Sequence, residues 1–208
     1  SQLKSDRADL HRRLAGVIES QGLPDQNAAL IAKHLESAGE LVDAYSWHMR
    51  AGGWSSRRHI AAALSHWERA RVISDALPAE DPNRLSMRIV PRTLVCGNAW
   101  HVHTDISGAR FDEFRQLCTQ ADDKGSLAIG MCGLAMEHLS MGHVSDASAR
   151  VSELMALVDS IDDAALTAGV SFVVNLIKAE AGEWSEVLRW SQKVIDDTGG
   201  DAALGDVI

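Results

Sequence analysis

The sequence is short of the residues that interrupt helices or cross-link small folds. Only four prolines occur and none follows Pro91, so helices can continue without interruption through the second half of the chain. The three cysteines are widely spaced and form no CxxC pair, which favours buried thiols in a reducing, cytoplasmic compartment. No apolar run approaches the roughly 20 residues that a membrane-spanning helix needs, and no signal peptide is recognisable. We therefore expect no membrane partner.

Basic residues become scarce toward the C-terminus. The formal net charge is -9, and residues 141–208 carry 4 basic and 12 acidic side chains. Nucleic acids are bound mainly by Lys and Arg that neutralise phosphates, so we expect no nucleic-acid partner for this chain. An acidic stretch of this kind is most often a solvated surface.

Strand signals are also poor, because apolar and polar residues rarely alternate and the turn pair Asn-Gly is absent. Apolar residues recur instead at three- and four-residue steps, as in Leu10, Leu14, Val17 and Ile18. The sequence therefore predicts an all-α fold. The expected helices cover residues 6–21, 25–38, 40–52, 56–77, 82–103, 108–122, 124–141, 145–160, 163–181 and 185–197.

Three short segments share one pattern: a glycine, an apolar residue two positions on, then an acidic residue. They begin at Gly39, Gly142 and Gly182, and 40 residues separate the last two. A glycine can end a helix in the left-handed conformation, and an acidic side chain in the next first turn complements the helix dipole. We interpret the three glycines as corners between antiparallel helices of a repeat protein.

These hairpins resemble tetratricopeptide repeats, whose second helix keeps two alanines seven residues apart. Ala44 with Ala51, and Ala63 with Ala70, show that spacing. The usual Trp and Tyr of the first helix are mostly replaced. The resemblance implies a right-handed superhelix of antiparallel helix hairpins, which is a fold that binds partners on an extended concave face.

A second resemblance covers most of the chain. "DLHRRLAGVIE", "NAALIAKHLESAGELVDAYSWHMRAGGWS" and "AAALSHWERARVISDALP" are similar to the helical region of large actinobacterial regulators. In that family an AAA-type or related ATPase precedes such repeats, often behind an adenylate cyclase domain, and a LuxR-type DNA-binding domain follows them. The resemblance implies that residues 1–208 are one helical-repeat domain cut from a longer multidomain protein. Residues 6–21 belong either to the first hairpin or to a preceding segment.

The chemistry of that ATPase is absent from this chain, because no GxxxxGK[ST] phosphate loop occurs. His101 and His103 are a close histidine pair, but residues two apart on a helix point roughly 200° apart, so we expect interface histidines and no metal site. We predict no catalytic residue and no cofactor. Tryptophan is frequent at binding hot spots. The candidate groove or interface residues are Trp47, Trp67, Trp100, His101 and His103.

These observations predict a non-enzymatic protein-interaction and regulatory module. Its partner would be the ATPase domain of its own polypeptide, or another protein or peptide, in a cytoplasmic regulator of transcription or cyclic-nucleotide signalling. One alternative is a small-molecule inducer sensor, which would need an apolar pocket with a few polar groups. A spacer that self-associates is another.

Overall fold

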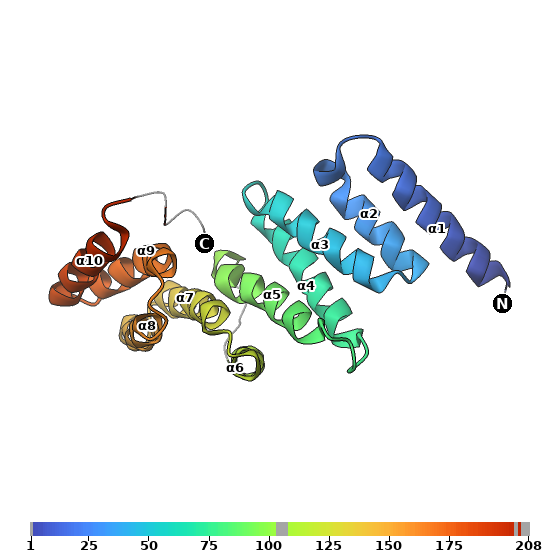
Figure 1. Ribbon diagram of the computed structural model, residues 1–208. Helices are drawn as coiled ribbons and strands as arrows, with labels where there is room; N and C mark the ends of the chain where they lie inside the picture. Colours follow the sequence, from blue (N-terminus) through green and yellow to red (C-terminus); the bar gives the residue numbers. More distant parts are fainter. Residues whose placement is uncertain (1, 103–107, 202–203, 205–208) are drawn as a thin grey trace. The chain divides into compact units, whose positions relative to one another are not determined.

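The computed structural model describes residues 2–102, 108–201 and 204, and every regular element in this part of the chain is a helix (Figure 1). The prediction of an all-α fold is confirmed. None of the described helices combines the length and apolar character that crossing a bilayer requires. The described helices are α1 (Gln2–Ser20), α2 (Pro24–Ala38), α3 (Leu41–Ser56), α4 (Ile60–Ala76), α5 (Arg84–Asn98), the 3-10 helix η1 (Ala99–Val102), α6 (Ala109–Ala121), α7 (Lys124–Ser140), α8 (Val144–Asp159), α9 (Ala164–Glu180) and α10 (Trp184–Thr198).

Most helix boundaries lie within a few residues of the predicted ones, and the largest internal difference is at the end of α5. We predicted one helix over residues 82–103, whereas α5 ends at Asn98 and η1 follows. Gly97 weakens the helix here, and its carbonyl oxygen accepts a hydrogen bond from the Trp100 indole at 3.1 Å. A carbonyl that already accepts a hydrogen bond from the indole does not need the backbone N–H that a further helical turn would supply.

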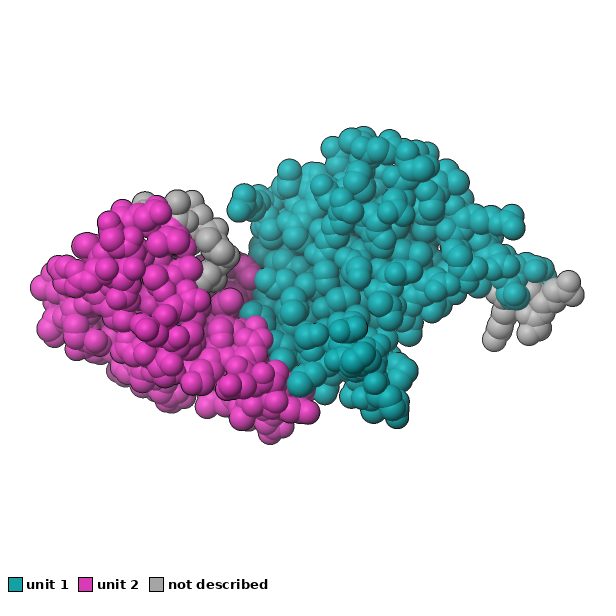
Figure 2. All heavy atoms as spheres, in the orientation of Figure 1, with its two compact units in different colours: residues 1–95 teal, residues 96–208 magenta. Residues whose placement is uncertain are grey.

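The contacts divide the chain into two compact units, coloured separately in Figure 2. Unit 1 covers residues 1–95 and unit 2 covers residues 96–208. From the sequence we predicted a single repeat domain over the whole chain.

In unit 1 the helices α1 to α4 pack in chain order, each against the next (Figure 1). The alanines of the tetratricopeptide-like spacing all lie in this packing, at 0–2% exposure. A small side chain at these positions lets neighbouring helices approach closely. These alanines are Ala44, Ala51, Ala63 and Ala70.

In unit 2 the helix α9 packs against α7 as well as against its neighbours α8 and α10. Glycines in α7 make the closest approaches. A Cβ atom on Gly133 would overlap the carbonyl oxygen of Cys96, and one on Gly130 would overlap the ring of Phe114. The backbone of α7 therefore lies directly against its neighbours in this unit.

The predicted corner glycines all have left-handed backbone conformations, with φ of 83°, 79° and 74° at Gly39, Gly142 and Gly182. At each corner the residue after the glycine donates its backbone N–H to the carbonyl five residues earlier, at 2.9–3.0 Å. This bond closes the Schellman motif that ends many helices. A fourth corner of the same form has the non-glycine residue Asp122 at φ 53°.

Candidate functional site

The predicted groove residues are divided between the two units, and one of them lies outside the described residues. Trp47 is half-buried in unit 1 and has the guanidinium of Arg50 over its ring at 4.8 Å. Trp67 is 3% exposed and packs between α3 and α4, where its indole occupies the space beside Gly52. Trp100 and His101 belong to unit 2 and stack at 3.7 Å between ring centroids. His103 lies outside the described residues.

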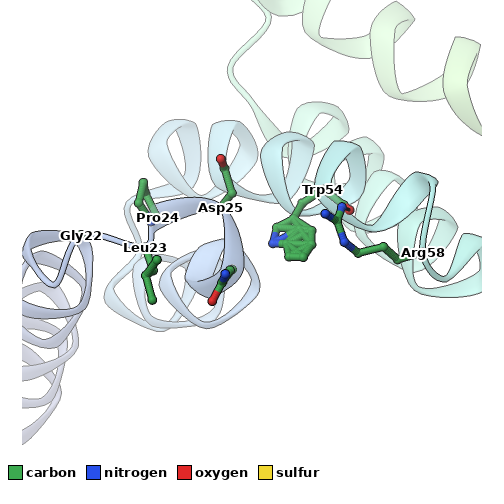
Figure 3. A pocket seen from close by; sticks show the side chains of 7 residues that line it. Gly22, Leu23, Pro24, Asp25, Trp54 and Arg58 are labelled. Carbon is green, nitrogen blue, oxygen red and sulfur yellow. Dashed lines mark hydrogen bonds between the residues drawn. The ribbon is translucent and has the colours of Figure 1, made fainter.

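A hollow in unit 1 contains a tryptophan that the sequence analysis did not select. It has a volume of about 520 Å³ and lies between the α1–α2 connection and the C-terminal end of α3 (Figure 3). We call it the Trp54 hollow. Its lining residues are Gly22, Leu23, Pro24, Asp25, Gln26, Trp54 and Arg58.

Trp54 and Arg58 form one wall of this hollow (Figure 3). The guanidinium carbon of Arg58 lies 3.3 Å from the centroid of the Trp54 ring, and Nη1 of Arg58 donates a hydrogen bond to the Trp54 carbonyl at 2.8 Å. Trp54 is half-buried, whereas Arg58 is exposed. The cation–π contact and the hydrogen bond together hold a positive charge beside an accessible indole.

The opposite wall is the start of α2. Leu23 is 54% exposed and is the N-cap residue of α2, and no side chain caps this helix end. Backbone N–H groups in the first turn of a helix lack intrahelical partners and carry partial positive charge. The carboxylate of Asp25, in this first turn, is paired with Arg50 at 2.6 Å. The hollow therefore offers apolar surface together with positive electrostatic character from Arg58 and the helix end.

A second hollow of unit 1, with a volume of about 560 Å³, lies on α2, α3 and α4. We call it the His48 hollow. In its floor, Nδ1 of His48 lies 3.1 Å from Nδ1 of His66, and Nε2 of His48 lies 3.3 Å from the Glu36 carboxylate. Arg69 also donates to Glu36 at 3.0 Å. The lining residues are Ala29, Lys33, Glu36, His48, Ser65, His66, Glu68, Arg69 and Val72.

The two histidines of this hollow are held in their neutral form at neutral pH. Burial lowers the pKa of His48 to about 4, because desolvation disfavours the charged imidazolium. Burial also lowers the pKa of His66, and the neighbouring His48 adds to that effect. The contact of His48 with Glu36 is thus a hydrogen bond of a neutral ring. Two neutral rings and a paired carboxylate make this floor polar without a free charge.

Both hollows were missed by sequence reasoning, for different reasons. Trp54 and Arg58 are four residues apart, and that spacing at a helix end was a usable signal for their contact. Glu36, His48 and His66 lie on three different helices, so their meeting depends on the packing of the hairpins. Spacing in the sequence carries no information about such a meeting.

Comparison with known proteins does not assign the chain to a family. No protein-family model matches it, and no curated protein matches it. The resemblance to actinobacterial regulators therefore remains a prediction.

Proposed function

We propose that this chain is a non-catalytic, tetratricopeptide-like interaction module that binds a peptide segment of a partner protein in the Trp54 hollow. The observation that carries the proposal is the half-buried Trp54 with the guanidinium of Arg58 stacked on it, facing the exposed Leu23. Tryptophan and arginine are the residue types that most often dominate binding energy at interfaces. A peptide that places an apolar side chain on the indole and a carboxylate near Arg58 fits this chemistry.

The form of the hollows favours a peptide over a small inducer. A small-molecule site usually encloses most of its ligand in an apolar cavity. The Trp54 and His48 hollows are both open to solvent, and two charged residues line the first and four line the second. A segment of a partner chain can lie across such a surface, while a small molecule would stay largely exposed.

The wider context of the proposal comes from the sequence resemblance. The partner segment would belong to the ATPase domain of a cytoplasmic regulator of transcription or cyclic-nucleotide signalling, and the module would bias that ATPase between two states. Such a bias requires different affinities for the two states, since equal binding to both shifts nothing.

The test is a displayed-peptide selection on the full chain, followed by fluorescence anisotropy of the selected labelled peptide. We expect Trp54→Ala to weaken binding by about 30-fold, which corresponds to about 2 kcal/mol for a hot-spot aromatic residue. The matched control is Trp184→Ala in α10, because Trp184 is 63% exposed and lies outside the hollow. This control should bind as the unmodified chain does.

Two results would contradict the proposal. One is a selection that yields no binding peptide. The other is a peptide that binds Trp54→Ala and the unmodified chain equally. A metabolite that raises the melting temperature of the chain, with its effect lost in Trp54→Ala, would favour the inducer-sensor function instead.

A further inference from the structure

The corner between α7 and α8 places three potential metal ligands together. His138 lies in the last turn of α7, His143 is the N-cap residue of α8, and Asp146 lies in its first turn. One ligand atom from each side chain lies within 4.8 Å of the other two, and the two imidazole centroids are 6.3 Å apart. Two imidazoles and one carboxylate are a donor set that first-row transition metals prefer.

The backbone of the corner brings these residues together. Gly142 adopts φ 79°, which allows the N–H of His143 to bond the carbonyl of His138 at 2.9 Å. The residue that ends one helix and the residue that starts the next are thereby fixed side by side. Asp146 follows three positions later, on the first turn of α8. The turn thus fixes the backbone positions from which the three side chains extend.

A second observation concerns the ring of His138. Nδ1 of His138 is buried and has no hydrogen-bond partner among the residues that the structure describes. Leaving a buried polar atom without a partner costs about 1–3 kcal/mol. A metal ion bound at this nitrogen would give it a partner.

The surroundings of the corner suit a cation that keeps an open coordination position. His138 and Asp146 line a hollow of about 300 Å³, to which Asp112 of α6 adds another carboxylate. Arg115 and Arg150 also line this hollow, where Arg150 pairs with Glu153 at 2.9 Å and Arg115 lies over the ring of Phe111. Unit 2 as a whole carries 7 basic and 18 acidic residues.

The next corner of unit 2 provides an internal comparison. Lys178 and Glu183 occupy the positions that His138 and His143 occupy, five residues apart across Gly182, with the same backbone hydrogen bond at 2.9 Å. There the two side chains form an ion pair at 2.7 Å. One corner thus holds a cation of the chain itself, whereas the other presents two imidazoles and a carboxylate.

We propose that His138, His143 and Asp146 bind one divalent transition-metal ion of the zinc class, leaving a coordination position open to water or to a partner's side chain. Tetrahedral zinc ligands lie roughly 3.4 Å from one another, given zinc–ligand distances of about 2.1 Å. His143 and Asp146 are exposed, so in the proposed site their side chains rotate toward His138 to reach this spacing. This inference is independent of the peptide site proposed for unit 1.

The test is calorimetric titration of the full chain with Zn²⁺, supported by the visible absorption spectrum of bound Co²⁺. We expect one ion per chain. His143→Ala and Asp146→Asn should each weaken binding by more than about 10-fold, since losing even an outer partner of a ligand costs roughly 10- to 100-fold. The matched control is Asp43→Asn, which removes the equivalent first-turn carboxylate of α3 and should leave zinc affinity unchanged.

A second variant separates loss of the site from loss of the fold. The double substitution His138→Lys and His143→Glu copies the Lys178–Glu183 pair into this corner, and it should abolish zinc binding while the chain stays helical by circular dichroism. Absence of zinc binding by the unmodified chain would overturn the proposal. So would full binding by both His143→Ala and Asp146→Asn, which would place the ion elsewhere, for example at the paired rings of His11 and His34.

Discussion

The two units differ in net charge and in the composition of their ion-pair networks. Residues 1–95 carry 13 basic and 11 acidic side chains, whereas residues 96–208 carry 7 and 18. In unit 1 a carboxylate collects several cations: Asp75 accepts from Arg71 at 3.0 Å, from Arg88 at 2.8 Å and from Arg92 at 2.9 Å. Hydrogen-bonded ion pairs therefore tie α4 to α5 in this unit.

In unit 2 a buried cation collects acceptors. The side chain of Lys178 is 2% exposed, and its Nζ donates to Ser148 Oγ at 2.8 Å, to Ser152 Oγ at 2.8 Å and to Glu183 at 2.7 Å. Hydrogen bonds from Lys178 and Ser148 lower the pKa of Glu183. In unit 2 a buried lysine thus binds several oxygen atoms, whereas in unit 1 one carboxylate binds several arginines.

Close packing also differs between the units. The largest loss of stability is expected where the backbone of α7 in unit 2 is packed most closely. Gly133→Ala should destabilise unit 2 by about 3 kcal/mol or more, because the new Cβ meets the rigid backbone of Cys96 and not a flexible side chain. Hydrogen exchange resolved by segment, with urea unfolding, measures the loss. Protection should fall in α7 and α9 and persist in α1 to α4.

Gly125→Ala is the matched control for that prediction. Gly125 lies in the same helix, but a Cβ there meets only the Asp123 side chain, at 3.8 Å. It should stabilise by up to about 1 kcal/mol, as Ala for Gly does in helices. If Gly133→Ala unfolds no more easily than Gly125→Ala, the direct backbone approach in unit 2 is wrong.

A smaller loss of stability is expected when Asp75, the carboxylate bound by the arginines of unit 1, is replaced. Burial by itself would raise the pKa of Asp75, but hydrogen bonds from Arg92 and Arg88 outweigh it and lower the pKa. Asp75→Asn should cost about 2–3 kcal/mol. Removing one partner of a buried ion pair costs about 3–5 kcal/mol, and Asp75 is partly exposed.

Urea unfolding followed by circular dichroism measures the effect of Asp75→Asn. The control Asp43→Asn removes an exposed first-turn carboxylate and should cost no more than about 1 kcal/mol. Equal effects of the two substitutions would mean that the network contributes nothing beyond an ordinary surface charge.

The helices and corners were largely readable from the sequence, because both depend on local patterns. Three- and four-residue periodicity marks the helices, and glycine followed by an acidic residue marks three corners. The connection at Asp122 was predicted between helices 108–122 and 124–141, but it was not recognised as a corner of the same form because a non-glycine residue takes the left-handed conformation there. No local sequence pattern generally indicates that a non-glycine residue will take this conformation.

The candidate sites were mostly not readable. His138 was not selected as a candidate residue, and a spacing of five residues to His143 is not a helical contact. The Schellman corner turns the chain between His138 and His143 and so brings the two residues together. Trp67 was selected as a groove residue, yet it fills the core beside Gly52. Exposure depends on which face of a helix a neighbour covers, and the sequence does not encode that locally.

The smallest expected effect concerns the neutral His48 in unit 1. Its pKa is about 4 in the folded chain, against 6.5 for an ordinary histidine. Between these two pH values His48 binds more protons in the unfolded chain than in the folded chain. The free energy of unfolding therefore rises as pH rises and falls as pH falls. Titration of His48 therefore lowers the free energy of unfolding by about 2 kcal/mol as the pH falls from 7 to 5.

His48→Gln removes this titration and keeps a side chain that can donate to Glu36. The pH dependence of stability over this window should therefore flatten by about 2 kcal/mol relative to the unmodified chain, as measured by urea unfolding at a series of pH values. Ser65→Ala, an exposed change in the same hollow that removes no titrating group, should keep the original slope. If His48→Gln keeps that slope as well, the imidazole is not held neutral by burial, and the polar floor of the His48 hollow is charged under mildly acidic conditions.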